Sequence, residues 1–386
     1  MNSKDIPRDA YGPEEVFVAE DTEIGMRGFL VIDNTRLGPG KGGIRMTPTI
    51  SREEVFRLAR TMTWKNALAG IPFGGAKGGI VWNGGSEKQK ESVVRSFARA
   101  IKKFIPHRYI GGPDVNTGER EMKWIAEELG EWNAVTGKPA DFCRDIDGKK
   151  QCGLPHELGS TGFGIARAAV IAAQRIGIDI KGSRVAIEGY GNVGSFSFQF
   201  LEAWGAKIVA IANRDTTLFN ESGIDGKRLA EVKASTGSIN GYEPARILSH
   251  DEIFGLPVDI LIPAAVTDVI HALNKDAIKA KIIIEGANIP MKESIEDELS
   301  QKGICIVPDF VANAGGVISS YAEYKGMNAE DMFRLVDEKI SASTRAVLAR
   351  ALETRENPRH AALTIAKAKV EAVSETQSNP PTWMRK

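Results

Sequence analysis

Three lysines lie in settings that favour chemistry over simple solvation. Lys41 stands in the segment GPGKGG, Lys65 in MTWKNA and Lys77 in GGAKGG. Glycine neighbours remove side chains, so that a substrate can approach the lysine closely. A lysine withdrawn from water or placed near other cations has a lowered pKa and can carry acid–base chemistry near neutral pH. Two or three such lysines converging on one cleft predict a substrate with one or two carboxylates.

Asp114 is the candidate acidic partner of these lysines. It stands in GGPDVNT, where a short strand is expected to end and a loop to begin. Loops on a rigid scaffold often carry catalytic side chains. A carboxylate that merely caps its own loop is the alternative interpretation, and the local sequence leaves both open.

A second glycine cluster predicts a dinucleotide site. The pattern GYGNVG follows the apolar strand expected at 184–188 and opens an expected helix. In that context the glycines permit a tight turn and close approach to a pyrophosphate, which the helix N-terminus then binds. A purely structural glycine turn is the alternative. The predicted cofactor contacts are Gly189, Gly191, Asn192, Val193 and Gly194.

The end of the next expected strand, at 207–212, bears on the choice of cofactor. An acidic residue there accepts hydrogen bonds from the ribose of NAD, whereas a cation can pair with the 2′-phosphate of NADP. Neutral Asn213 and then Arg214 occupy this place, and Asp215 follows. We therefore expect NADP or NAD, with NADP slightly favoured.

The expected elements that carry these motifs predict an α/β protein. The first part mixes strands and helices, among them a strand at 28–33 and a helix opened by the capping pattern at Ser51. From about residue 160, strands and helices alternate, which predicts a doubly wound, Rossmann-like parallel sheet. Long helices are expected at 329–373, with an interruption near Asn357, and the tail from Gln377 is expected to be loose.

The composition excludes several classes of function. Fifty basic residues balance fifty acidic ones, so no global charge favours nucleic acid or a membrane surface. The sequence shows neither a signal peptide nor a run of about 18 apolar residues that would span a membrane. The three cysteines are an odd number without a CxxC pair, which argues against disulfides and zinc. Thiols in a reducing, cytoplasmic location are expected.

Across nearly its whole length the chain resembles the glutamate/leucine/phenylalanine/valine dehydrogenases. The resemblance is carried by GPGKGGIRM, LARTMTWKNALAGIPFGGAKGGI, GGPDVNT, STGFG, EGYGNVG, DILIPAA, EGANIP and VPDFVANAGGVISSYAE. It implies reversible, NAD(P)-dependent oxidative deamination of an L-amino acid to a 2-oxo acid and ammonia. It also implies a homo-oligomer, most commonly a hexamer, with small molecules as its other partners and no metal.

The resemblance assigns roles to individual residues. Lys77 would polarise the substrate carbonyl and the attacking water, and Asp114 would move protons on the amine. Lys65 would bind the α-carboxylate. Further substrate contacts would be Met62, Asn313, Gly316 and Val317. Further cofactor contacts would be Thr161, Ala264, Ala265 and Asn288.

The resemblance also implies a substrate. In the glutamate branch a lysine in the KGG segment and a serine after AGGV hold the side-chain carboxylate, and here these positions are Lys41 and Ser320. A lysine in an apolar pocket would leave an unpaired charge, which disfavours apolar substrates. L-Glutamate is therefore expected. A leucine-, phenylalanine- or valine-type enzyme and a non-catalytic homologue that only binds cofactor are the alternatives.

The same resemblance divides the chain. Residues 1–154 would form the substrate and assembly domain, residues 155–345 the cofactor domain, and the helices within 346–386 would return to the first domain. One segment departs from the family pattern, because GLPHELGSTG at 153–162 replaces GRxEATG and Gly159 stands where a glutamate is usual. Glu188 replaces a common glutamine. Cys152 and His156 near this segment are interpreted as incidental.

Overall fold

The computed structural model describes residues 6–146, 148–155 and 158–376 and divides into two compact units. Unit 1 comprises residues 1–158, 317–332 and 363–386, and unit 2 comprises residues 159–316 and 333–362. The division differs from the expected one in three segments, the first being residues 155–158, which fall in unit 1. Residues 317–332 belong to unit 1, and the C-terminal return to unit 1 begins at 363 instead of 346. His156 and the tail from Gln377 lie outside the described residues.

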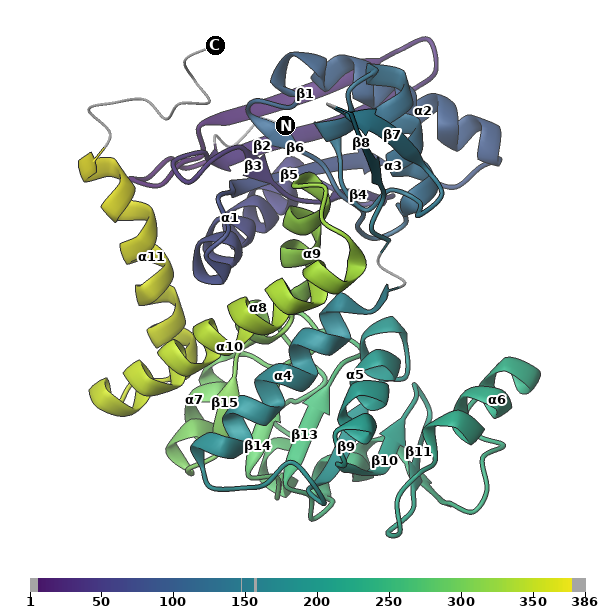
Figure 1. Ribbon diagram of the computed structural model, residues 1–386, viewed down its shortest axis with the longest axis vertical. Helices are drawn as coiled ribbons and strands as arrows, with labels where there is room; N and C mark the ends of the chain where they lie inside the picture. Colours follow the sequence, from purple (N-terminus) through teal and green to yellow (C-terminus); the bar gives the residue numbers. More distant parts are fainter. Residues whose placement is uncertain (1–5, 147, 156–157, 377–386) are drawn as a thin grey trace. The chain divides into compact units, whose positions relative to one another are not determined.

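Unit 1 is built on a six-stranded mixed sheet (Figure 1). The strand order is β1-β2-β5-β3-β6, and β4 also pairs with β5. β5 lies antiparallel to β2 and parallel to β3 and β4. The strands are β1 (Glu15–Asp21), β2 (Met26–Asn34), β3 (Gly40–Lys41), β4 (Ile44–Thr47), β5 (Gly74–Val81) and β6 (Tyr109–Ile110).

Helices cover this sheet. The expected helix after Ser51 is confirmed, because the Ser51 hydroxyl accepts a hydrogen bond from the backbone N–H of Glu54 at 3.2 Å. α2 and α3 pack their apolar faces on a core that includes Phe97, Tyr109 and Ile125. The helices of unit 1 are α1 (Arg52–Ala69), α2 (Glu87–Ile101) and α3 (Glu119–Leu129), with short 3-10 helices at Lys102–Phe104 and Trp132–Ala134.

A hairpin of β7 (Cys143–Ile146) and β8 (Lys149–Cys152) corrects the expectation for the cysteines. Its antiparallel register sets Cys143 opposite Cys152, with their Cα atoms 4.0 Å apart, and the two form a disulfide. Free thiols were therefore the wrong prediction for this pair. The bond depends on hairpin register, which the count and spacing of the cysteines did not reveal. Cys305 is a free thiol, and burial raises its pKa to about 11.

Unit 2 contains the predicted doubly wound sheet, in the order β12-β11-β10-β9-β13-β14-β15. β10, β9, β13, β14 and β15 are parallel, whereas β11 and β12 extend one edge in antiparallel fashion and were not predicted. The strands are β9 (Arg184–Glu188), β10 (Lys207–Ala212), β11 (Thr216–Phe219), β12 (Arg246–Ser249), β13 (Ile260–Pro263), β14 (Ile282–Ile284) and β15 (Cys305–Val307).

The buried parallel strands are short apolar runs, as expected where helices cover both faces of a sheet. In Figure 1, α4 and α5 run across this sheet. The helices of unit 2 are α4 (Ser160–Arg175), α5 (Asn192–Ala203), α6 (Gly226–Thr236), α7 (Glu293–Gln301) and α8 (Asp309–Ala312), with 3-10 helices at His250–Gly255 and Lys275–Ala277.

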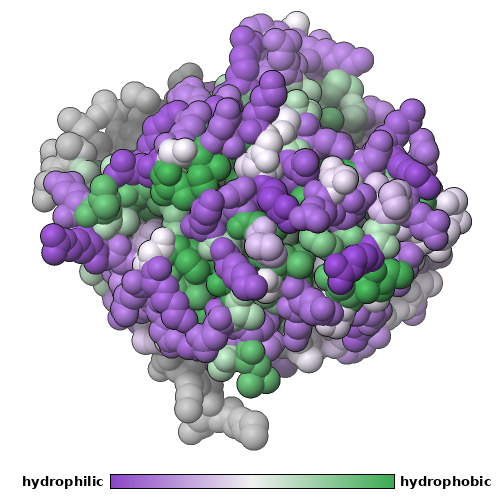
Figure 2. All heavy atoms as spheres, turned by 90° about the horizontal axis from the view of Figure 1, so that it is seen from below, coloured by the Kyte–Doolittle hydropathy of each residue, from purple (hydrophilic) through white to green (hydrophobic). Residues whose placement is uncertain are grey.

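Three helices have residues in both units. They are α9 (Gly315–Tyr324), α10 (Ala329–Thr354) and α11 (Pro358–Thr376). The break between α10 and α11 falls at Asn357, as expected. Among the described residues, no helix is both long and apolar enough to cross a membrane. The face drawn in Figure 2 is largely hydrophilic, with small hydrophobic clusters between the polar groups.

Candidate active site

Lys77 and Asp114 form an ion pair in unit 1, as the site requires. Lys77 lies in the middle of β5 and is 5% exposed, and Asp114 lies in the loop after β6. A second cation, Arg45 of β4, donates from Nε to the other oxygen of the same carboxylate at 2.8 Å. Arg45 also pairs with Glu54 at 3.0 Å.

This arrangement fixes the charge of Asp114. Burial alone would raise its pKa, but the Lys77 ammonium and the Arg45 guanidinium outweigh burial and hold the pKa well below its usual range. The carboxylate is therefore ionised at neutral pH, and it holds Lys77 in place. The loop-capping interpretation is also partly correct, because Asp114 accepts a hydrogen bond from the backbone N–H of Val115 at 2.7 Å.

The glycines around Lys77 have a reason that sequence reasoning did not identify. A Cβ atom on Gly75 would lie 2.1 Å from the Thr63 hydroxyl, and one on Gly79 would lie 2.6 Å from a Val55 methyl group. Both partners belong to α1. These glycines therefore let α1 pack directly on β5, which fixes the strand that carries Lys77.

Lys41 is a buried cation beside this pair. It is 2% exposed, and its Nζ donates to the Gly111 carbonyl at 2.6 Å. Burial lowers its pKa to about 7, opposed by Glu323 and assisted by Lys138 and Lys77. A Cβ atom on Gly112 would lie 2.6 Å from Nζ, so the glycine makes room for the ammonium.

The backbone of Lys41 is attached to α1. Asn66 donates from one amide nitrogen to the Lys41 carbonyl at 3.3 Å and to the Gly74 carbonyl at 2.6 Å, which ties the end of β3 to the start of β5. Met62 and Lys65 lie three residues apart on the same helix and therefore face the same way. The Met62 side chain lies beside Gly42.

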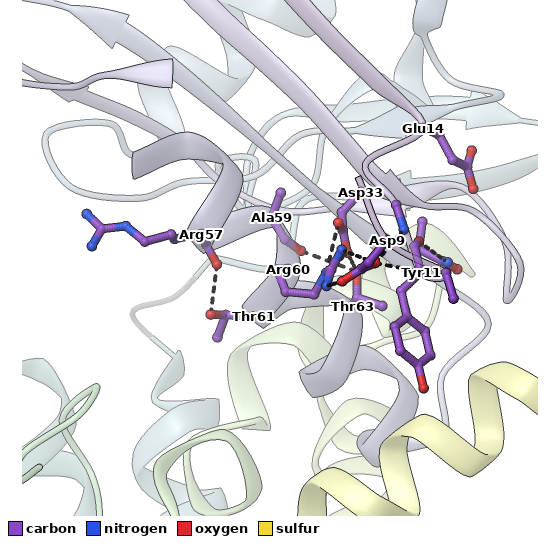
Figure 3. A network of polar contacts seen from close by, with 12 residues as sticks. Asp9, Tyr11, Glu14, Asp33, Arg57, Ala59, Arg60, Thr61 and Thr63 are labelled. Carbon is purple, nitrogen blue, oxygen red and sulfur yellow. Dashed lines mark hydrogen bonds and ion pairs between the residues drawn. The ribbon is translucent and has the colours of Figure 1, made fainter. Parts of the chain in front are cut away.

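A polar network anchors α1 to the sheet (Figure 3). Arg60 donates to the buried Asp33 carboxylate of β2 at 2.8 Å and to Asp9 at 2.7 Å. Thr63 donates to the same Asp33 carboxylate at 2.5 Å. Two side chains of α1 thus bind the same carboxylate of β2, which fixes the helix that carries Met62 and Lys65.

Val317 and Ser320 lie on the part of α9 that belongs to unit 1. Three residues further along, the buried Glu323 carboxylate forms an ion pair with Lys138 at 2.6 Å. The same carboxylate accepts hydrogen bonds from the backbone N–H groups of Gly137 at 2.6 Å and Leu154 at 3.1 Å. Because Glu323 also acts on the Lys41 ammonium, α9 lies near Lys41.

A cavity of about 890 Å³ in unit 2 contains the predicted dinucleotide segment. A Cβ atom on Gly191 would meet nothing within 4 Å, so this glycine leaves open space, whereas one on Gly194 would lie 1.9 Å from the Gly189 carbonyl. Gly189 has φ +103°, which favours glycine. Predicted residues that line the cavity are Gly189, Gly191, Asn192, Val193, Asn213, Arg214, Ala264 and Ala265.

Asn213 and Arg214 differ in their role at this cavity. The Asn213 side-chain oxygen accepts hydrogen bonds from the backbone N–H groups of Asp215 and Thr216, both at 2.9 Å, and its amide nitrogen donates to Asn240 at 2.7 Å. Asn213 is thus occupied by its own turn. Arg214 is exposed and lines the cavity, whereas Asp215 is not among the lining residues.

The expected nicotinamide contacts come together elsewhere in unit 2. Asn313 donates to the side-chain oxygen of Asn288 at 3.0 Å and to the Gly286 carbonyl at 3.2 Å. A Cβ atom on Gly315 would lie 2.1 Å from the Ser160 carbonyl, so the start of α9, where Gly316 follows, packs against Thr161 at the start of α4. These groups therefore form one cluster.

Gly159 has a local structural reason for departing from the family pattern. It precedes α4 with φ +79°, and an added Cβ atom would lie 2.3 Å from the Phe196 ring. A glutamate in this backbone conformation would be strained and would collide with the ring. The substitution therefore accompanies the aromatic residue at 196.

Sequence reasoning missed three contributors. Arg45 lies only four residues after Lys41 in the same motif, and that proximity was its one available signal. The Lys138–Glu323 pair joins residues 185 positions apart and had no local signal. Glu188 lines the cavity, and its carboxylate lies 3.3 Å from His250 Nε2, while burial raises the pKa of Glu188.

Family comparison agrees with this geometry. Residues 14–131 match the dimerisation domain of the Glu/Leu/Phe/Val dehydrogenases, and residues 153–378 match the Glutamate/Leucine/Phenylalanine/Valine dehydrogenase domain. The chain belongs to this family of amino-acid dehydrogenases.

Individual relatives are similar over most of their length. The chain is 38% identical over 330 residues to the glutamate dehydrogenase of Aeropyrum pernix, which covers 82% of this chain and 77% of that protein. It is 39% identical over 306 residues to the NADP-specific glutamate dehydrogenase of Saccharolobus shibatae, and the match covers 75% of this chain and 69% of that protein. It is 34% identical over 312 residues to the NAD-specific glutamate dehydrogenase of Clostridioides difficile, and the match covers 77% of this chain and 72% of that protein.

Solved structures show the same fold. The glutamate dehydrogenase of Peptoniphilus asaccharolyticus is 30% identical, with a TM-score of 0.80 over 95% of this chain and 92% of that one. The predicted fold class is thereby confirmed.

Replacing Arg45 with glutamine should raise the pKa of Asp114 toward its usual range, because a partly buried carboxylate loses one of two adjacent cations. The carboxyl 13C shift of Asp114, followed by NMR as the pH is lowered, measures the change. Arg27→Gln is the control, since Arg27 is a largely exposed arginine of the same unit whose ion-pair partner is the exposed Glu20. An Asp114 titration that is the same in Arg45→Gln and wild type would show that Arg45 does not set this charge.

Proposed function

We propose that this protein catalyses the reversible, NAD(P)-dependent oxidative deamination of L-glutamate to 2-oxoglutarate and ammonia. The observation that carries the proposal is the buried Lys41. Its ammonium bonds to a backbone carbonyl, and in the described part of the chain no carboxylate forms an ion pair with it. A buried cation is costly unless it is paired. The distal carboxylate of glutamate would supply that pair, with Ser320 on the nearby α9 as a second contact.

The remaining groups of unit 1 fit the chemistry. Lys65 on α1 is proposed to bind the α-carboxylate, beside Met62. Lys77 would stabilise negative charge that develops on the substrate oxygen and orient the attacking water. Asp114 would hold Lys77 in place, since its carboxylate already contacts the Lys77 ammonium. It would also exchange protons with the amino group of the substrate.

The cavity of unit 2 fits a dinucleotide. Open space beside Gly191 and the start of α5 at Asn192 provide room and backbone donors for a pyrophosphate. The nicotinamide cofactor supplies the hydride acceptor. Thr161, Asn288 and Asn313 are proposed to orient the nicotinamide, with Gly316 leaving backbone room for the substrate.

NADP is proposed as the slightly favoured cofactor, and NAD remains possible for this cavity. Arg214 lines the cavity, and Asn213 offers no carboxylate to a ribose. The relatives include both NADP-specific and NAD-specific enzymes, so the family alone does not decide.

We further propose a homo-oligomer, with a hexamer favoured, on the strength of the match to the family's dimerisation domain. A cytoplasmic location is also proposed. The cysteines do not add to this proposal, because Cys143 and Cys152 form a disulfide. Sedimentation equilibrium would give the stoichiometry.

The two alternative functions are less well supported. A leucine-type enzyme would bury the Lys41 ammonium against an apolar side chain with no partner. A non-catalytic homologue would have no use for Lys77 paired with a strongly ionised Asp114.

A substrate panel tests the proposal directly. Glutamate, leucine, phenylalanine and valine are each assayed with NAD and NADP, in wild type and in Lys41→Leu. We expect glutamate to have the highest kcat/KM in wild type. We expect Lys41→Leu to lower that value roughly 100-fold, because one partner of a buried charge pair is removed. Glutamate turnover that is undiminished in Lys41→Leu, or leucine as the best wild-type substrate, would refute the proposal.

The KM for 2-oxoglutarate should depend on pH through Lys41. Only the ammonium attracts the distal carboxylate, and in the free protein its pKa is about 7. The KM is therefore lowest below this pKa and should rise by up to about tenfold per pH unit above it. Initial rates of NAD(P)H oxidation at saturating ammonia measure this dependence. The control substrate is 2-oxobutyrate, whose KM should change far less because it lacks the distal carboxylate; parallel changes for both would contradict a role for Lys41.

Replacing Arg214 with glutamine should lower kcat/KM for NADPH by about 10- to 100-fold, the value of a lost charge-assisted hydrogen bond to a phosphate. The kcat/KM for NADH should stay within about twofold of the wild-type value. Arg246→Gln serves as a control, since Arg246 is an exposed arginine of the same unit outside the cavity. An equal loss with both cofactors would show that Arg214 does not read the 2′-phosphate.

A further inference from the structure

A second cavity, of about 210 Å³, lies within unit 1 and is not used by the proposed reaction. Its walls come from four segments: the loop before β3, the turn before β5, the loop before β6 and the end of α9. Its lining residues are Leu37, Gly38, Pro39, Pro72, Phe73, Pro106, His107, Tyr321, Tyr324 and Lys325.

The cavity has an apolar interior and a polar rim. The buried Phe73 ring contacts the rings of Tyr321 and Tyr324 edge-on, at centroid distances of 5.6 and 5.4 Å. At the rim, Lys325 and His107 are exposed. Apolar walls with a few polar groups at one end are the usual make-up of a small-molecule site.

The polar groups of the rim are available to a ligand. Within the described part of the chain, the Lys325 ammonium, the His107 ring and the hydroxyls of Tyr321 and Tyr324 have no hydrogen-bond or ion-pair partner. None of the lining residues is acidic. Glu131 acts on the Tyr324 hydroxyl from outside the cavity, and its carboxylate is engaged with the backbone of Asn133 at 2.9 Å.

These observations specify the ligand's chemistry. The volume of about 210 Å³ suits a ligand smaller than the drug-sized molecules that typical protein pockets hold. An anionic head would pair with the Lys325 ammonium, while an apolar tail would contact the Phe73 ring. An ammonium group would find two cationic or donor groups and no acid, so an amino acid should bind less well than the corresponding simple carboxylate.

The walls of the cavity are shared with the proposed substrate groups. Pro39 is followed by β3 with Lys41, and Phe73 is followed by β5 with Lys77. Gly74 donates from its backbone N–H to the carbonyls of Gly38 at 3.2 Å and Pro39 at 3.0 Å, so the two loops are joined. Another wall belongs to the helix that carries Ser320. A ligand in the cavity therefore contacts segments that adjoin Lys41, Lys77 and Ser320.

We propose that this cavity is a binding site for a small monocarboxylate with a branched apolar tail, and that its occupancy alters binding of the 2-oxo acid substrate. The effect on substrate binding rests on the proposed function, whereas the binding site itself does not.

The test uses 3-methylbutanoate, which has seven non-hydrogen atoms, with two matched probes. Valine adds only an α-ammonium group, and 3-methylbutanamide removes only the charge. Binding to the full chain is measured by titration calorimetry at saturating 2-oxoglutarate, so that the substrate groups are occupied. We expect saturable binding of one 3-methylbutanoate per chain, with Kd on the order of 1 mM, and at least fivefold weaker binding of both matched probes.

Two exposed lysines provide the variants. Lys325→Gln should weaken binding of 3-methylbutanoate at least fivefold and leave basal activity unchanged. Lys88→Gln, on α2 of the same unit, should change neither. Absence of saturable binding, equal binding by wild type and Lys325→Gln, or equal binding of valine would overturn the site.

The effect on the substrate is measured separately. At saturating 3-methylbutanoate the KM for 2-oxoglutarate should change at least twofold in wild type and not in Lys325→Gln. Binding that leaves this KM unchanged would overturn the transmitted effect. If the protein did not turn over 2-oxoglutarate, the proposed function would fail, while calorimetry without that substrate would still decide the site.

Discussion

The buried Glu323 carboxylate is the interaction on which the substrate half of the molecule depends. It accepts three backbone hydrogen bonds, from the N–H groups of Gly137, Lys138 and Leu154, and it pairs with the Lys138 ammonium in a nearly water-free environment. Removing one partner of such a pair leaves an uncompensated charge and typically costs about 3–5 kcal/mol. Because Glu323 lies on α9, the same contact fixes the helix that carries Ser320. It also lends Lys41 part of the negative potential that offsets its burial.

The buried lysines of unit 1 differ in how many carboxylate and carbonyl oxygens surround each ammonium group. Lys77 shares the Asp114 carboxylate with Arg45, whereas Lys138 has Glu323 and two backbone carbonyls, of Val135 at 2.7 Å and Trp132 at 3.2 Å. Lys41 has one carbonyl only. The group with least compensation gains most from an incoming carboxylate, so the free energy of substrate binding is concentrated at Lys41. The neutral net charge of the chain conceals this local excess of cations.

Local patterns in the sequence predicted much of the fold and part of the site. β9 and β10 begin and end where their apolar runs do, and the capping pattern placed α1 correctly. β11 and β12 were missed because they lie at a sheet edge, where β12 is largely exposed and carries no apolar run. The Cys143–Cys152 bond and the Lys138–Glu323 pair were missed for another reason. Both depend on which segments meet in space, and periodicity along the chain does not encode that.

The glycine clusters show how a correct inference can rest on an incomplete reason. Glycines were expected to admit a ligand, and Gly191 lies beside open space in the cavity of unit 2. Around Lys77 the glycines instead admit a helix, since Gly75 and Gly79 contact α1 with no room for a side chain. Lys77 is therefore fixed by packing from one face and by Asp114 at its tip. If Lys77 has the catalytic role proposed for it, an ammonium held in both ways loses little entropy when a substrate arrives, which favours stabilisation of charge on the reacting oxygen.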